Sequence, residues 1–280
     1  MRNISVTEIA NNIKEMCIEA NHFLSADMKI ALDNACAKEE SEVGKKVLEQ
    51  LQENLRIASK DLIPICQDTG MTVVFMEIGQ DVHFTDGNLE DAINEGVRVG
   101  YKEGYLRKSV VSDPILRENT KDNTPAVIHY SIVPGDKVTI TVAPKGFGSE
   151  NMSQVIMLKP ADGMEGVKKA ILTAVKNAGP NACPPMVVGV GIGGTFEKCA
   201  LLAKKALTRD VCDYSPIPHI KKMEEELLEQ INQSGIGPAG LGGRNTALAV
   251  NIETYATHIA GLPVAVNICC HVNRHCKRII

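Results

Sequence analysis

The sequence predicts a mixed α/β fold, with a helical N-terminal section over residues 1–60 and α/β layers over residues 61–280. In the first section apolar residues recur at helical spacing among Glu, Lys and Gln. After Asp61 the pattern changes to short β-branched runs bounded by Gly, Pro and Asp, which is typical of strands and turns. We find no repeat and no convincing linker, so one domain is predicted for the whole chain.

The N-terminal section is predicted to be a bundle of three helices, because residues such as Val43, Val47, Leu51 and Leu55 form one apolar stripe. Beyond it, period-two alternation favours strands and 3.6-residue periodicity favours helices. A Gly179-Pro180 pair ends one of these helices. The predicted elements are strands 72–78, 126–133, 137–143 and 186–192, helices 89–105, 164–178, 196–207 and 220–231, and a strand from 263 that ends at a pair of cysteines.

Composition excludes several classes of protein. The chain has 280 residues, is 44% hydrophobic and can bury a large core. Its 30 basic and 34 acidic residues are mixed along the sequence, which argues against a nucleic-acid partner. There is no secretory leader and no apolar run long enough for a membrane span, so a cytoplasmic protein is expected. In a reducing compartment the nine cysteines stay thiols, and Cys17 and Cys36, on predicted helices, are expected to be buried packing residues.

Three loops combine a cysteine with residues that disfavour regular structure. Cys66 is followed by Gln67 and Asp68 in a turn before a strand, and a simple turn would need neither the thiol nor the amide. Cys183 precedes two prolines that fix the backbone. Near the C-terminus, only one of Cys269 and Cys270 can face a given site, because neighbouring strand residues point to opposite sides.

Two other interpretations of the motifs stay open. Cys270, His271, His275 and Cys276 have the ligand types of a zinc site, although they crowd into seven residues without the usual long loop. Two stretches, 189–194 and 235–240, match the glycine fingerprint of dinucleotide-binding proteins. The first two glycines of the first stretch lie inside the predicted strand 186–192, and the second stretch follows a helix, so an NAD-dependent oxidoreductase is the weaker alternative. Both loops still offer backbone N–H groups suited to a substrate carboxylate.

Taken together, the loops resemble the class I, iron-sulfur-dependent fumarate hydratase family, specifically the separate alpha subunit of its two-subunit members, and they are also similar to the alpha subunit of L-tartrate dehydratase. The resemblance covers nearly all of the chain after Asp61. It rests on Ile65-Cys66-Gln67-Asp68-Thr69-Gly70, Leu106-Arg107-x-Ser109-Val110-Val111, Pro144-Lys145-Gly146-Phe147-Gly148-Ser149-Glu150-Asn151, Ala182-Cys183-Pro184-Pro185, Gly193-Gly194-Thr195, Gly240-Leu241-Gly242-Gly243 and the segment from His258 to Arg274.

This resemblance implies a 4Fe–4S cluster held by Cys66, Cys183 and Cys270. With three thiolates instead of four, one iron keeps an open position and acts as a Lewis acid on a hydroxyl and a carboxylate of the substrate. The implied reaction is the reversible hydration of fumarate to (S)-malate, with tartrate dehydration or mesaconate hydration as alternatives. By the same resemblance the bound dicarboxylate is surrounded by Gln67, Asp68, Arg107 and Gly148.

Proton transfer is expected from Asp68 or from His258. Asp68 is favoured because it lies two residues from a proposed ligand and so within a few residues of the iron. Arg107 is the best donor for the charge that develops on the substrate carboxylate, whereas Arg244 is expected to be a surface cation. Because Cys270 lies ten residues before the end of the sequence, we expect something else to cover the cluster, and the resemblance implies that this is a separate beta subunit in a hetero-oligomer.

Overall fold

A computed structural model describes residues 1–280 and groups them into two compact units. Unit 1 consists of Met1–Ser25, Leu55–Gly146 and Arg274–Ile280, and unit 2 consists of Ala26–Asn54 and Phe147–Asn273. Each unit is therefore assembled from separate stretches of sequence. The mixed α/β prediction is confirmed.

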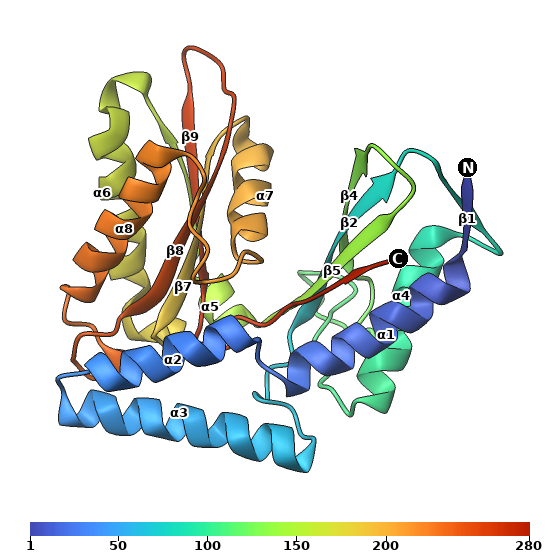
Figure 1. The fold of residues 1–280 in the computed structure, drawn as a ribbon, viewed down its shortest axis with the longest axis horizontal. Helices are drawn as coiled ribbons and strands as arrows, with labels where there is room; N and C mark the ends of the chain where they lie inside the picture. Colours follow the sequence, from blue (N-terminus) through green and yellow to red (C-terminus); the bar gives the residue numbers. More distant parts are fainter. The chain divides into compact units, whose positions relative to one another are not determined.

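Unit 1 is built on a four-stranded mixed sheet (Figure 1). Its strand order is β10 (Cys276–Ile279), β5 (Val138–Lys145), β2 (Met71–Gly79) and β4 (Val127–Val133). The β2 and β4 strands are parallel, whereas β5 runs antiparallel to both β2 and β10. A separate parallel pair is formed by β1 (Arg2–Ser5) and β3 (Val82–Thr85). Strands β2, β4 and β5 confirm three predictions, while β1, β3 and β10 were not foreseen.

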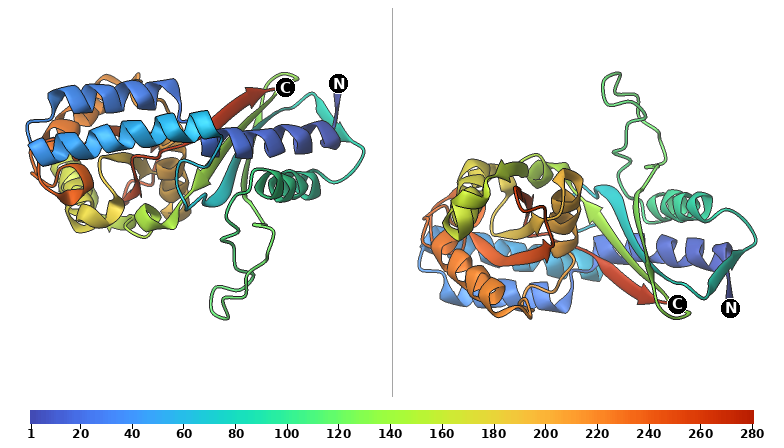
Figure 2. Two further views of the ribbon diagram at one scale, coloured as in Figure 1. Left: turned by 90° about the horizontal axis from the view of Figure 1, so that it is seen from below. Right: turned by 90° about the horizontal axis from the view of Figure 1, so that it is seen from above.

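Two helices, α1 (Val6–His22) and α4 (Leu89–Glu103), pack on each other and share one hydrophobic core with β2 and β5. Glycine permits their close approach, because a Cβ atom on Gly96 would lie 2.5 Å from the Ala10 carbonyl oxygen. The helix prediction for 89–105 is confirmed, with Asn88 as the N-cap of α4. Between α4 and β4, residues 106–126 form a long irregular loop, which is drawn in green in Figure 2.

Unit 2 contains a second four-stranded sheet with helices on both faces (Figure 1). Its strand order is β6 (Gln154–Leu158), β9 (Leu262–Cys269), β7 (Met186–Gly193) and β8 (Ala247–Tyr255). On one face lie α6 (Gly163–Ala178) and α8 (Pro218–Asn232), which share the largest apolar cluster with the sheet, and on the other lies α7 (Phe196–Ala206). All three helices and strands β7 and β9 agree with the predicted positions, whereas β6 and β8 were missed.

The glycines of strand β7 serve this packing. A Cβ atom on Gly189 would lie 2.3 Å from the Ala203 carbonyl oxygen, and one on Gly191 would lie 2.0 Å from that of Cys199. Real Cβ contacts are never this short, so only glycine lets β7 lie directly against the α7 backbone. Close strand-to-helix packing thus accounts for the first two glycines of the 189–194 fingerprint.

The three predicted N-terminal helices are present as α1, α2 (Ala26–Lys38) and α3 (Glu42–Asp61), but they do not form one bundle. Helix α1 belongs to unit 1 and packs on α4, whereas α2 belongs to unit 2 and contacts β8. The bundle prediction was wrong because an apolar stripe shows that a face is buried, not what covers it. Cys17 and Cys36 are buried on α1 and α2, as predicted. No helix has the length and apolar character needed to cross a membrane.

Candidate active site

The loop of residues 65–70 lies in unit 1 and leads into β2, and its backbone is held from several directions. Its first N–H, on Ile65, donates to the Asn21 carbonyl oxygen at 2.9 Å. At its other end the buried Tyr101 hydroxyl lies 2.8 Å from the Thr69 carbonyl oxygen and 2.9 Å from that of Gly70. Asn123 adds a hydrogen bond from Nδ2 to the Gly70 oxygen at 3.1 Å. These hydrogen bonds hold the loop in one conformation, because side chains take the place of the strand pairing that its carbonyl groups lack.

Asp68 is fixed within this loop. Its Oδ1 accepts a hydrogen bond from the Gly70 N–H at 3.0 Å, the geometry of an Asx turn. Its Oδ2 faces Gly146, where a Cβ atom would lie 2.9 Å away. Gly70 itself has a φ of +77°, and a Cβ there would lie 2.6 Å from the Lys145 backbone. Glycine is thus needed on both sides of the carboxylate, and the half-buried Asp68 is held against the start of the 146–148 segment.

Arg107 is joined to the same loop through its backbone. The Thr69 hydroxyl accepts from the Arg107 N–H at 2.9 Å and donates to the Arg107 carbonyl oxygen at 3.2 Å. The Arg107 side chain is exposed, as is that of Gln67, whereas Cys66 is half-buried. Unit 1 therefore brings together four of the predicted site residues: Cys66, Gln67, Asp68 and Arg107.

Cys183 lies in unit 2 at the end of a short 3₁₀ helix, Gly179–Ala182, and is exposed. Its backbone is left-handed, with a φ of +51°, which is uncommon for a residue with a side chain. The glycine-rich loop 235–243 supports this turn: Ala239 N–H donates to the Pro184 carbonyl oxygen at 2.9 Å, and a Cβ on Gly240 would lie 2.3 Å from Pro180. Gly240 therefore lets the loop rest directly on Pro180, a structural role for the last glycine of the second fingerprint.

Cys270 follows directly after β9 and adjoins the Cys183 turn. Its N–H donates to Ser149 Oγ at 3.2 Å, and the next residue, His271, places Nδ1 3.1 Å from the Cys183 carbonyl oxygen. Ser149 lies on α5 (Phe147–Glu150), which also carries the exposed Gly148. Cys269 is 6% exposed inside the sheet, whereas Cys270 is half-exposed beyond it. Unit 2 therefore brings Cys183, Cys270 and Gly148 to one end of its sheet.

His258 lies elsewhere in unit 2. It is an exposed residue on the turn between β8 and β9, where its Nδ1 accepts from the Ala260 N–H at 3.1 Å. The whole of β9 separates this turn from Cys270 (Figure 1), and at about 3.3 Å per residue the two ends are roughly 25 Å apart. Within unit 2 the structure does not bring His258 to the cysteines.

Glu39 holds the residues that follow the glycine-rich loop 235–243, and no pattern in the sequence singled it out. Its carboxylate follows α2 and accepts hydrogen bonds from the N–H groups of Ser41, Arg244 and Asn245 and from the Asn245 side chain. Burial alone would raise the pKa of Glu39, but these hydrogen bonds outweigh it and lower the pKa to about 2. The clamp fixes the end of the glycine-rich loop. The Arg244 guanidinium is exposed and pairs with Glu40 at 3.0 Å, as expected of a surface cation.

The residues of the zinc alternative are distributed over both units. Cys270 and His271 belong to unit 2, whereas His275 and Cys276 belong to unit 1. Cys276 starts β10 and packs against the unit 1 core, where burial raises its pKa to about 11. Within either unit, no three His, Cys, Asp or Glu side chains are arranged as a metal site.

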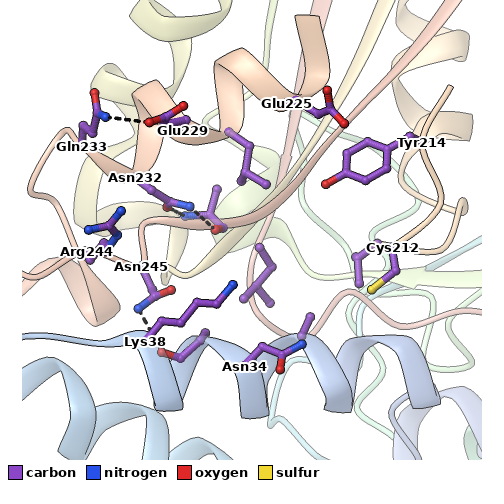
Figure 3. A pocket seen from close by; sticks show the side chains of 16 residues that line it. Asn34, Lys38, Cys212, Tyr214, Glu225, Glu229, Asn232, Gln233, Arg244 and Asn245 are labelled. Atoms are coloured by element: carbon purple, nitrogen blue, oxygen red, sulfur yellow. Dashed lines mark hydrogen bonds between the residues drawn. The ribbon is translucent and has the colours of Figure 1, made fainter. Parts of the chain in front are cut away.

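A pocket of about 580 Å³ in unit 2 lies between α2, α8 and the start of β8 (Figure 3). Lys38 and Asn34 from α2 and Tyr214 from the loop before α8 border it, with Asn245 at its base. None of the predicted cysteine ligands lines it, so it is separate from the candidate site.

In each unit, the candidate residues are thiols and polar groups on loops held by hydrogen bonds, positions that are often functional. The family model of fumarate hydratase (Fumerase) matches residues 10–279, and this chain belongs to that family. It is accordingly an enzyme of the hydro-lyase class.

Relatives match over most of the chain. A protein of Methanocaldococcus jannaschii, provisionally named L(+)-tartrate dehydratase subunit alpha, is 43% identical over 97% of this chain and 98% of its own length. The L(+)-tartrate dehydratase subunit alpha of Escherichia coli strain UTI89 is 33% identical over 84% of this chain and 78% of its own length. The protein of that name in Shigella boydii is 32% identical over the same shares of the two chains. The fumarate hydratase resemblance inferred from the loops is therefore confirmed.

Proposed function

We propose that the chain is the alpha subunit of a 4Fe–4S hydro-lyase that adds water to a C4 dicarboxylate, with Cys66, Cys183 and Cys270 as the cluster ligands. The donor chemistry fits such a cluster, because soft thiolates are its usual ligands. Cys66 lies on the loop between α3 and β2, Cys183 follows a 3₁₀ helix and Cys270 follows β9; hydrogen bonds hold all three segments, and each cysteine is at least partly exposed. Among the neighbouring pair, Cys270 is the better candidate because Cys269 is buried within the sheet.

The observation that carries this proposal is where the chain passes between the units. One passage, between Gly146 and Phe147, starts at the residue that abuts Asp68 and leads within three residues to Ser149, which binds Cys270. Another, between Asn273 and Arg274, leads from Cys270 to Arg274, which donates to the Asp68 carbonyl oxygen. Four residues of chain span at most about 14 Å. Along the chain, three residues therefore join Gly146, which abuts Asp68, to Ser149, and four residues join Cys270 to Arg274.

When bound, the cluster would supply an iron with an open position that polarises the substrate hydroxyl and a carboxylate. The residues of this chain would do the rest. Arg107 and Gln67 would hold the dicarboxylate, the exposed backbone at Gly148 would donate to it, and Asp68 would move the proton at the neighbouring carbon. Asp68 is better placed than His258 for this step, because it shares the rigid loop of Cys66 while His258 lies on the distant turn of unit 2.

The substrate and partner belong to the same proposal. Fumarate hydration to (S)-malate is the first candidate from the family, and dehydration of L(+)-tartrate is the second, favoured by the names of the relatives. Mesaconate hydration would use the same chemistry. Those names also specify an alpha subunit, so we propose a beta subunit that completes the active site in a cytoplasmic hetero-oligomer.

The test is to prepare the chain without oxygen, alone and together with its beta partner, and to measure iron, sulfide and the rates with fumarate and L(+)-tartrate. We expect about four iron and four sulfide per chain in both preparations, but substantial activity only in the complex. Zinc without sulfide would refute the cluster, and full activity of the isolated chain would refute the requirement for a partner.

A further inference from the structure

Arg274 is a buried cation with no acidic partner. It is the first residue of the C-terminal stretch of unit 1, and its side chain and backbone together are only 3% exposed. Its Nη2 donates to the Asp68 carbonyl oxygen, while Nε and Nη1 are buried without a hydrogen-bond partner, and it forms no ion pair. A guanidinium cannot lose its proton in a protein, so this charge is kept in the interior at a cost to stability.

The contact of Arg274 completes the support of the Asp68–Gly70 backbone. Tyr101 and Asn123 hold the carbonyl groups of Thr69 and Gly70, and Arg274 holds that of Asp68. Tyr101 and Asn123 are neutral, whereas Arg274 brings a positive charge. Burial raises the pKa of Tyr101, and the positive charge of Arg274 opposes this rise in part.

We propose that Arg274 is a positioning residue for the reaction: it fixes the peptide plane of Asp68 and thereby the direction of the Asp68 carboxylate. The inference rests on the proposed function, in which Asp68 moves the proton. The Asp68 side chain has the Gly70 N–H on one oxygen and Gly146 against the other, so a rotation of its peptide plane would displace both contacts.

The charge of Arg274 also has a role in this proposal. A cation without a carboxylate partner is expensive in the folded protein alone, but it is favourable beside groups that become anionic in use. Thiolates that hold a cluster and a substrate with two carboxylates are such groups. A neutral side chain of similar length should therefore not restore the function of Arg274, whereas another cationic side chain should restore part of it.

Arg274→Met and Arg274→Lys separate these effects, with Arg278→Met as the control. Arg278 lies on β10, four residues away, and pairs with Glu15 and Glu19 instead of the loop. Four quantities are compared in each variant: kcat and KM of the loaded complex, its melting temperature, and amide hydrogen exchange of residues 66–72 in the chain without cluster.

We expect Arg274→Met to lower kcat by roughly 30-fold or more with KM within about threefold, since small displacements of a reacting group cost up to about 100-fold. Arg274→Lys should recover much of this loss, and the melting temperatures of both variants should stay within about 5 °C of that of Arg278→Met. In the chain without cluster, Arg274→Met should speed exchange at residues 68–70 about tenfold, and Arg278→Met should not.

A kcat for Arg274→Met within threefold of the control, or equal losses in the Lys and Met variants, would overturn the inference. If Arg274→Met does not fold, Arg274→Lys is compared with the control Arg278→Met. Exchange at residues 68–70 and kcat equal to those of the control would then overturn the inference. The exchange measurement does not depend on the reaction. If exchange is faster in Arg274→Met but the complex with native Arg274 has no hydro-lyase activity, the proposed function is contradicted while the support of the loop by Arg274 stands.

Discussion

Replacement of Glu39 by Gln should destabilise unit 2 in a pH-dependent way. The Glu39 carboxylate accepts hydrogen bonds from Arg244 N–H and from both the backbone and side-chain N–H groups of Asn245. A pKa held at about 2, against 4.5 for an ordinary Glu, corresponds to roughly 3 kcal/mol of stability at neutral pH, because each tenfold change is about 1.4 kcal/mol. In Glu39→Gln an NH₂ group replaces one carboxylate oxygen, and this NH₂ group cannot accept hydrogen bonds from the N–H groups that face it.

The sign of the pH dependence follows from the lowered pKa. A carboxyl whose pKa is lower in the folded state stabilises fully above its unfolded pKa and loses this contribution as the pH falls toward the folded value. For Glu39 the contribution should be roughly 3 kcal/mol at pH 7, about 1–1.5 kcal/mol at pH 3, and nearly absent below pH 2.

Urea denaturation of the chain at pH 7 and pH 3 measures this effect. We expect Glu39→Gln to lower the free energy of unfolding by about 3 kcal/mol at pH 7 and by clearly less at pH 3. The matched control is Glu40→Gln, next in sequence, whose exposed ion pair with Arg244 should be worth less than about 1 kcal/mol. Equal losses in the two variants, or a loss for Glu39→Gln that does not change with pH, would refute the assignment of the clamp.

Two further substitutions test the packing and the loop. Gly191→Ala would place Cβ 2.0 Å from the Cys199 carbonyl oxygen, so the melting temperature should fall by roughly 10 °C. The control Gly261→Ala meets only ordinary contacts and should change the melting temperature little. A normal melting temperature for Gly191→Ala would contradict the packing of β7 on α7. Tyr101→Phe leaves the buried Gly70 carbonyl oxygen with one partner fewer and should cost about 1–3 kcal/mol in urea denaturation, together with a lower kcat. Unchanged stability and kcat would mean that the hydroxyl does not hold the loop.

Local patterns in the sequence predicted most of the regular structure. Amphipathic helices such as α4 and α8 have a strong 3.6-residue period, and β5 alternates along its length, so their positions were found within a few residues. Strands β6 and β8 were missed because a short apolar run, such as residues 155–158 or 247–250, can belong to a buried strand or to a buried helix by periodicity alone. The division into units has no linker to reveal it, since both units are assembled from distant stretches.

The site shows the same difference between local and distant information. Cysteines and glycines in unusual contexts directed attention to residues 66–70, 183 and 270, and the structure shows why the glycines are there: Gly70 and Gly240 let one backbone rest on another. Glu39 and Arg274 could not be found in this way. Their partners are more than 200 residues away in the sequence, and an isolated Glu or Arg is most often a surface residue.

The neighbouring pair Cys269 and Cys270 offers the most direct test of a three-cysteine cluster. Iron and sulfide should be measured in oxygen-free preparations of the Cys269→Ser and Cys270→Ser variants of the complex. We predict that Cys270→Ser loses most of its iron and sulfide, as Cys66→Ser and Cys183→Ser should, while Cys269→Ser keeps about four of each. Full iron and sulfide in Cys270→Ser, or their loss only in Cys269→Ser, would contradict the account.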